Sequence, residues 1–521
     1  MIPERAAGLL IPLFALRSAG DFGRGDIGGL AAAGKLAHAM GQRLILLLPI
    51  DETPPGEASP YSALSVFAID SLYISARGLR GVSKGARAAA RQSIEGGPRD
   101  LVRLRTVKEG LLDLAFQHFH ARAGTPERAA FEEFAAANRE WLDDYALFRA
   151  LKHKFAGAGW SQWPPELSRH DPRAIAEAER ALADEIERFK FRQFLAQTQW
   201  SKARDGLRRL GVFLGGDLAF SPARDSAEVW ARQEMFDLTR SVGAPPDAFS
   251  ATGQRWGLPM PNWERMRAEG FTFLRTRVRR ARALYDFIRV DHVVGLFRTY
   301  GYPNGAETVG AFDPVDEDAQ QAQGEELLRL ILAEAGPMRI IAEDLGVIPP
   351  FVRATLARLD LPGYKIVRWE RDWAAPGQPF FSPATYPAAS LATTGTHDTD
   401  TLAEWWETIH EEERRRFVED LGIGEGLARS VLSPSPIDRA TFDEAPLDGI
   451  IEAIYASPSR LAILPIQDLF GWKDRINVPG TVDASNWSWR LPFDPAHAAD
   501  DPKLRARIEQ IRALAERTGR F

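Results

Sequence analysis

The chain has 521 residues, with 65 Lys and Arg against 71 Asp and Glu and a formal net charge of −6. This mild acidity argues against a nucleic-acid or membrane-surface binder, which would carry a basic excess. Cysteine is absent, which excludes disulfide frameworks, thiolate metal sites and cysteine nucleophiles. No apolar run approaches the ~18 residues that span a bilayer, so we predict no membrane partner.

The N-terminal segment 6–16 is apolar and follows Arg5, which superficially resembles a secretory signal. Pro12 interrupts the run, Glu4 offsets Arg5, and no small-x-small cleavage site follows. We therefore expect a cytoplasmic protein.

Eight short apolar runs are bounded by turns or polar residues, and helical stretches separate most of them. Such runs are typical of buried parallel strands, and eight of them favour an α/β fold of the (β/α)8 barrel type. A doubly wound sheet gives a similar pattern and remains open at this point. The runs are 44–50, 69–74, 212–218, 287–293, 339–345, 364–369, 391–396 and 461–466.

The segment 76–205 is too long for one crossover and is rich in Ala, Arg and Glu. Thr125 and Asp171 each precede a proline, which is the order of a helix N-cap and a first-turn proline. We predict a mostly helical subdomain inserted after the second strand into a barrel that spans residues 1–521.

Acidic residues stand at the ends of the predicted strands. They are Asp217, Asp291, Glu343, Asp344 and Asp398. A charge directly after a buried strand is costly unless it lies at the strand mouth, and parallel strands of a barrel open on one face. These acids are therefore expected to converge, although each taken alone could be an ordinary helix N-cap.

Paired carboxylates suit glycoside chemistry, in which one is the nucleophile and the other, with a raised pKa, protonates the leaving oxygen. Arg289 lies two residues before Asp291 and so points to the same side of a strand, where it would keep Asp291 ionised. A structural ion pair explains that spacing equally well. His397, beside Asp398, is a candidate for hydrogen bonding to a sugar hydroxyl.

The segment 245–265 brackets Trp256 with glycines and polar residues, as in a lid-like loop over a site. A plain surface loop is the alternative.

Two other motifs do not point to function. The glycines at 23–28 match G-x-G-x-x-G but do not follow a strand directly, so we predict no dinucleotide site. The arginine run at 275–282 lacks interleaved aromatics, and we interpret it as a solvated helix face rather than an RNA-binding patch.

Taken together, the motifs resemble those of the 4-α-glucanotransferases (amylomaltase or disproportionating enzyme, glycoside hydrolase family 77), a branch of the α-amylase superfamily. The resemblance runs nearly end to end. It is carried most specifically by R-x-D-H at 289–292, A-E-D-L-G at 342–346 and G-T-H-D at 395–398, in that order.

The resemblance implies a (β/α)8 barrel that moves α-1,4-glucan segments between donor and acceptor maltooligosaccharides or glucose, with no organic cofactor. Asp291 would be the nucleophile, Glu343 the general acid/base, and Asp398 the stabiliser of the distorted sugar. The implied substrate-binding residues are Ser59, Tyr61, Asp217, Trp256, Arg289, Asp344, His397 and Asn477. We predict no metal site, because His118 and His120 are spaced to point apart on a helix.

The chain departs from the family pattern beside the site. Leu258 and Pro261 replace the usual Asn and Tyr after the lid tryptophan, and residues 218–222 replace the usual P-I-Y-V. These changes leave the acids intact but concern the acceptor subsites. Two alternatives remain at this stage: a hydrolase of the α-amylase type, and a catalytically altered glucan-binding homologue.

Overall fold

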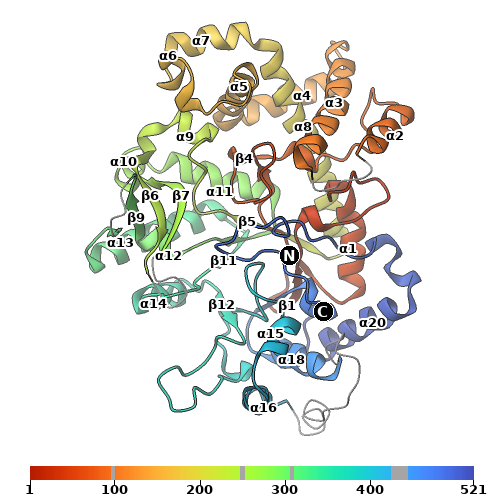
Figure 1. The fold of residues 1–521 in the computed structure, drawn as a ribbon, viewed down its shortest axis with the longest axis vertical. Helices are drawn as coiled ribbons and strands as arrows, with labels where there is room; N and C mark the ends of the chain where they lie inside the picture. The colour runs from red at the N-terminus through yellow and green to blue at the C-terminus, as the bar shows by residue number, and fades with distance from the viewer. Residues whose placement is uncertain (95–99, 247–252, 306–309, 424–443) are drawn as a thin grey trace.

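Eight parallel strands close into a barrel at the centre of the molecule (Figure 1). The computed structural model describes residues 1–521 except 95–99, 247–252, 306–309 and 424–443. Every neighbouring pair in the barrel is parallel, which confirms the predicted fold class. In chain order the strands are β1 (Ala6–Leu10), β2 (Leu44–Leu46), β5 (Phe213–Leu218), β8 (Phe287–Val290), β11 (Arg339–Ala342), β12 (Gly363–Ile366), β13 (Ser390–Thr393) and β14 (Leu461–Pro465).

One of the eight predicted strands was wrong. The run 69–74 is not part of the barrel: it begins at the end of β4 (Ser65–Ile69), which pairs antiparallel with β3 (Asp51–Glu52). The first barrel strand is instead β1, whose five residues are all buried. A short buried hairpin strand and a short barrel strand have the same apolar pattern, so the run alone does not separate them. The other seven runs each overlap a barrel strand.

In the described residues seven α-helices lie between β4 and β5, and they form the orange-to-yellow upper part of Figure 1. The predicted caps are present: Thr125 Oγ1 accepts from the Arg128 amide, and Asp171 accepts from the amides of residues 173 and 174. The helices are α2 (Lys84–Gln92), α3 (Leu101–His120), α4 (Pro126–Ala137), α5 (Arg139–Lys154), α6 (Pro165–Ser168), α7 (Pro172–Ala181) and α8 (Ala183–Arg209).

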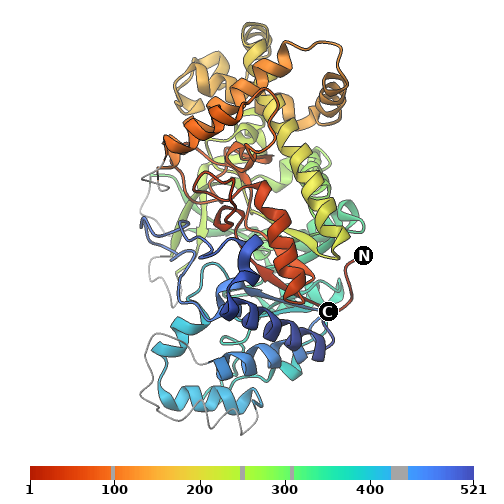
Figure 2. The ribbon, with the colours of Figure 1, turned by 90° about the vertical axis from the view of Figure 1, so that its right-hand side faces the viewer.

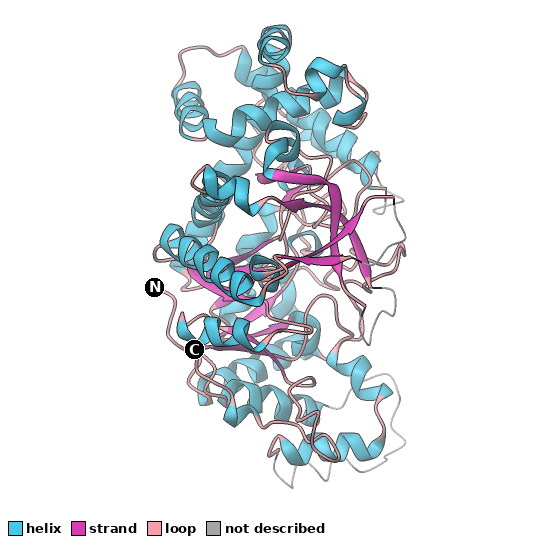
Figure 3. Ribbon diagram, turned by 90° about the vertical axis from the view of Figure 1, so that its left-hand side faces the viewer, coloured by secondary structure: helices cyan, strands magenta, loops and turns pink. Residues whose placement is uncertain are grey.

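A separate antiparallel sheet is formed by segments inserted after β5 and β8, and Figure 3 shows it apart from the barrel strands. Its order is β10–β9–β6–β7, with β6 (Phe236–Ala244), β7 (Gln254–Pro261), β9 (Thr299–Pro303) and β10 (Ala311–Asp313). Part of the predicted lid, 245–265, is therefore strand β7 rather than loop, and its residues 247–252 lie outside the described part of the chain.

The remaining helices surround the barrel, and the chain ends meet: the Ala7 amide at the start of β1 donates to the Arg520 carbonyl at 3.3 Å (Figure 2). None of the helices in the described ranges is long and apolar enough to cross a bilayer. The remaining α-helices of the described ranges are α1 (Leu30–Ala39), α9 (Ala227–Ala231), α10 (Trp263–Ala268), α11 (Thr272–Leu284), α12 (Val294–Phe297), α13 (Glu317–Ala335), α14 (Pro350–Arg358), α15 (Leu402–Thr408), α16 (Glu411–Asp420), α18 (Glu444–Ala456), α19 (Ile466–Phe470) and α20 (Pro502–Arg517).

The arginine run on α11 is a solvated face only in part, because Arg279 and Arg282 are exposed whereas two others are not. Arg277 and Arg280 are buried, and they donate to the backbone carbonyls of Ala219 and Phe67 respectively. A planar guanidinium with five donors can satisfy several carbonyls at once, which explains why arginine serves inside the protein here.

Candidate active site

Three of the predicted acids meet at the carboxyl ends of adjacent strands. Asp217 lies near the end of β5, Asp291 follows β8, and Glu343 follows β11. β8 pairs with β5 on one side and β11 on the other, with Arg289 opposite both Asp217 and Ile341. The fold thus brings together acids that are far apart in sequence, as the strand-end argument predicted.

Arg289 is the shared cation of this cluster. Its Nη1 lies 2.6 and 2.8 Å from the two oxygens of Asp217 and 2.8 Å from Asp291 Oδ1, and its Nη2 lies 3.6 Å from Glu343 Oε2. The Asp217 side chain is fully buried, whereas that of Asp291 is 22% exposed. Asp291 therefore keeps access to solvent while it is paired with a guanidinium.

The surroundings of Glu343 favour its protonated form up to near neutral pH. Burial, reinforced by the Asp291 charge and opposed by Arg289, raises the pKa of Glu343 to about 7. Its oxygens accept hydrogen bonds from the amides of His292 at 2.8 Å and Leu345 at 2.9 Å. His292 reaches this geometry with a positive φ of 48°, a backbone conformation that non-glycine residues seldom adopt outside functional sites.

Asp398 has the opposite titration behaviour. Burial alone would raise its pKa, but the His397 ring, the Asn477 amide and the Arg289 charge together lower it to about 2. Asn477 Nδ2 donates to Asp398 Oδ1 at 2.7 Å, and His397 Nε2 lies 3.2 Å from Oδ2. The carboxylate is 43% exposed, so an ionised acid faces the opening of the barrel.

Tyr61 connects the two halves of the site. Its hydroxyl donates to Asp217 Oδ2 at 2.7 Å and lies 3.0 Å from His397 Nε2, and its ring stacks on the His397 ring with centroids 5.4 Å apart. Ser59 supports the same turn, since its Oγ accepts from the Tyr61 amide at 3.3 Å. The predicted residue Tyr61 thus reaches the barrel mouth from outside the barrel, whereas the groove-lining role of Ser59 stays a prediction.

Trp256, on β7, packs edge-on against the ring of His292 with centroids 4.8 Å apart. Phe220 packs edge-on against the same ring at 5.4 Å. Leu258 and Trp256 both pack on a small apolar cluster that contains Phe220. Two of the departures from the family pattern, Leu258 and Phe220, therefore lie in the same apolar cluster as Trp256.

Asp344 is the predicted residue whose contacts differ most from the expectation. Its Oδ1 accepts from the Tyr364 amide on β12 at 2.7 Å, and Oδ2 lies 3.5 Å from Arg353 Nε. Its carboxylate therefore caps the neighbouring strand. The groove-lining role of Asp344 stays a prediction.

The structure also places in the site His292 and Trp487, for which the sequence predicted no role. Trp487 contacts both Tyr61 and His397, with centroids 5.9 and 5.8 Å away, and has a positive φ of 59°. His292 follows the nucleophile candidate directly, and that adjacency was the available signal. Trp487 lies in a loop far from both partners in sequence, where nothing in its own neighbourhood pointed to the site.

Comparison with known proteins agrees with this geometry. The 4-alpha-glucanotransferase family profile matches residues 11–495. A 4-alpha-glucanotransferase of Thermus thermophilus is 34% identical, with 99% of both chains covered, and one of a Synechocystis strain is 32% identical, with 95% of both covered. The amylomaltase of Streptococcus agalactiae, solved in complex with acarbose, superposes with a TM-score of 0.83 at 25% identity over 99% of both chains. The chain belongs to the 4-alpha-glucanotransferase family.

Proposed function

We propose that the chain transfers segments of α-1,4-glucan between maltooligosaccharides by a retaining double displacement at this site. The observation that carries the proposal is that two carboxylates lie at different distances from one guanidinium. Arg289 pairs closely with Asp291, while Glu343, at the other end of the same group, has a pKa near 7. A nucleophile that is ionised and an acid that holds its proton are what the first step needs.

In the first step a carboxylate oxygen of Asp291 attacks the anomeric carbon of the donor glucan. The bond from that carbon to the glycosidic oxygen breaks, and Glu343 gives its proton to the departing oxygen. The products are a glycosyl ester of Asp291 and a shortened glucan with a free 4-hydroxyl group. Retention requires carboxyl groups about 5–5.5 Å apart, and two carboxylates paired with one guanidinium fit such a spacing.

In the second step the ionised Glu343 takes the proton from the 4-hydroxyl of an acceptor glucan, whose oxygen attacks the ester-linked anomeric carbon. The bond to Asp291 breaks and the α configuration returns. Asp398 stays ionised throughout, and its charge opposes the positive charge that develops on the sugar ring. Tyr61, His397 and Asn477 orient these groups and contact the sugar bound between them.

Transfer rather than hydrolysis requires that water be kept from the ester intermediate. Trp256 is the candidate shield, because its ring packs on His292 beside the nucleophile. We assign segment 245–265 as a lid, segment 76–205 as an inserted subdomain, and Ser59 and Asp344 as groove residues. The cytoplasm is the proposed location and maltooligosaccharides or glucose the proposed partners.

Incubation with maltotriose tests the proposal. Transfer yields glucose together with a ladder of longer and shorter glucans, whereas a hydrolase of the α-amylase type yields only shorter products. A glucan-binding homologue without activity yields neither. Because the Streptococcus agalactiae enzyme binds acarbose, we also expect acarbose to inhibit the transfer. An absence of products longer than maltotriose would refute the proposed function.

A further inference from the structure

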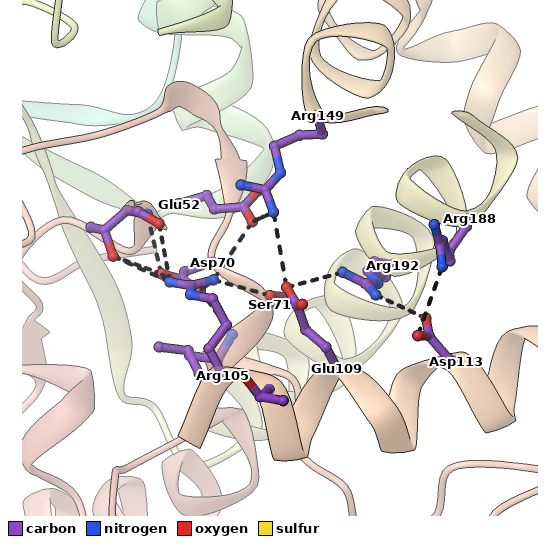
Figure 4. Close-up of polar contacts among 12 residues, drawn as sticks. Glu52, Asp70, Ser71, Arg105, Glu109, Asp113, Arg149, Arg188 and Arg192 are labelled. Atoms are coloured by element: carbon purple, nitrogen blue, oxygen red, sulfur yellow. Dashed lines mark hydrogen bonds and ion pairs between the residues drawn. The ribbon is translucent and has the colours of Figure 1, made fainter. Parts of the chain in front are cut away.

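The loop between β3 and β4, residues 53–64, carries Tyr61 into the site, and buried charged side chains contact its two ends. Four side chains form what we call the loop-base cluster: Glu52, Asp70, Arg105 and Arg149. Their side chains are 1–9% exposed. Glu52 and Asp70 flank the hairpin, whereas Arg105 belongs to α3 and Arg149 to α5. Figure 4 shows the two arginines pointing from the inserted helices toward the hairpin.

Arg105 bonds both to the first residue of the loop and to the residue directly after β4. Its Nη1 and Nη2 bond the two oxygens of Asp70 at 3.0 and 2.9 Å, and Nη2 also donates to the Thr53 carbonyl at 3.1 Å. The Thr53 amide and hydroxyl donate to Asp70 Oδ2 at 3.2 and 3.1 Å. The first residue of the loop and the residue directly after β4 are thus fixed to one guanidinium on α3.

Glu52 is fixed from the other side. Its carboxylate accepts from the Tyr145 hydroxyl and lies 3.4 Å from Arg149 Nη2 and 3.7 Å from Arg105 Nη1. Its backbone carbonyl accepts from the Leu64 amide at 2.6 Å, at the last residue of the loop. Both ends of the loop therefore depend on side chains of α3 and α5.

The ion pairs continue outward along the helices and become more exposed (Figure 4). Glu109 lies 3.9 Å from Arg149 and 3.1 Å from Arg192, and Arg192 pairs with Asp113 at 2.8 Å. At the outer end Arg188 lies 3.8 Å from Asp113, and these two side chains are 20% and 35% exposed. That outer pair has the same chemistry as Arg149 and Glu52 but does not touch the hairpin in the described residues.

Buried ion pairs add little stability relative to apolar replacements, because desolvation offsets the attraction. They do restrict geometry, since a buried guanidinium must keep its partners in a fixed arrangement. The tip of the loop needs such restriction, because the Tyr61 hydroxyl must lie between Asp217 and His397 at 2.7 and 3.0 Å. Sites of this kind tolerate errors of only about 0.5 Å.

We propose that Arg105 and Arg149 are positioning residues for the transfer reaction. From the inserted helices, and without contact to substrate, they hold the loop 53–64 so that the Tyr61 hydroxyl bridges Asp217 and His397. The inserted helices thereby serve catalysis through the loop-base cluster. This inference rests on the proposed function.

The test is a double-mutant cycle with the full-length enzyme and maltotriose. The first change is Glu52→Gln with Arg149→Met, which removes the pair without stranding a charge, because Glu109 keeps Arg192 and Arg105 keeps Asp70. The second is Tyr61→Phe, which removes the hydroxyl through which the cluster acts. The matched control is Asp113→Asn with Arg188→Met. A melting curve for each variant checks that it is folded.

If the cluster positions Tyr61, the combined Glu52→Gln and Arg149→Met change should lower kcat about 10-fold in the parent enzyme. In the Tyr61→Phe background the same change should lower kcat less than about 2-fold, because the effects of residues that act as one unit are not additive. The control pair should change kcat less than about 2-fold. If the inner pair is needed for folding, Tyr145→Phe enters the same cycle instead, since it removes one hydrogen bond to Glu52 and creates no charge.

Equal losses of kcat in both backgrounds would overturn the inference, because a purely structural defect acts independently of Tyr61. An equal loss from the outer control pair would do the same. These outcomes leave the proposed function intact, since they require an active parent. A parent that makes no products longer than maltotriose would instead refute the proposed function itself.

Discussion

Replacing Glu343 with glutamine should stabilise the protein at alkaline pH while abolishing transfer. Burial raises the pKa of Glu343 from 4.5 to about 7 in the folded chain. Between these values the folded state holds a proton that the unfolded state has released. The stability contributed by this group is therefore fully present below pH 4.5 and is lost as the pH rises through 7.

The magnitude follows from the pKa difference. At about 1.36 kcal/mol per pH unit, the parent should lose roughly 2–3 kcal/mol from this group between about pH 5 and about pH 8. Glutamine does not ionise, so the variant escapes this loss. It loses roughly 1 kcal/mol at every pH, because its single amide oxygen can accept from only one of the Leu345 and His292 amides. That cost cancels when the two pH values are compared.

Urea unfolding of the parent and of Glu343→Gln at about pH 5 and about pH 8 measures the effect. The stability of the variant relative to the parent should rise by roughly 2–3 kcal/mol at the higher pH. Glu411→Gln is the matched control, because it makes the same substitution at a side chain that is 72% exposed. A stability difference for Glu343→Gln that is the same at both pH values would refute the assignment of a buried, proton-holding acid.

Four further predictions concern the reaction itself. Asp291→Asn should lower kcat on maltotriose by about 10³-fold or more, and a near-parental rate would exclude the nucleophile role. The kcat/KM for transfer should fall as the pH rises through about 7, because Glu343 must enter the first step protonated; a profile flat to pH ~9 would contradict this. Asn477→Ala removes a donor to Asp398, so the pKa of Asp398 should rise and the acid limb of the same profile should move to higher pH; an unmoved limb would argue against it. Trp256→Ala should raise the ratio of hydrolysis to transfer several-fold, measured as new reducing ends per glucose released, and an unchanged ratio would remove Trp256 as the water shield.

The barrel and its acids could be predicted because both follow from local signals. A buried parallel strand needs a continuous apolar run, and a charged residue directly after it must lie at the mouth. These two rules placed Asp217, Asp291 and Glu343 together without knowledge of their distances. They failed for the strand β1, because Ala6–Leu10 is short and Pro12 follows closely, and for the run at 69–74, because a buried hairpin meets the same apolar condition.

The connections between distant segments could not be predicted from such rules. Tyr61 reaches Asp217 across 156 residues and His397 across 336, and no periodicity records that pairing. The arginines of α11 illustrate the same limit. Their spacing suits a solvated face, yet Arg277 is buried and donates to the carbonyls of Ala219 and Phe220, which follow β5. Which surface a helix buries depends on the partner that the fold presents to it.

The different behaviour of the acids follows from their distances to a few donors. Asp291 lies 2.8 Å from Arg289 and keeps a solvent-facing edge, whereas Glu343 is more buried and 3.6 Å from the same guanidinium. The weaker pairing leaves desolvation dominant at Glu343, so its pKa rises. At Asp398 the His397 ring and the neutral Asn477 amide offset the rise in pKa that burial causes, so this carboxylate stays ionised at the mouth of the barrel. One cation placed unequally between two carboxylates thus gives them different surroundings, as the proposed roles of nucleophile and acid require.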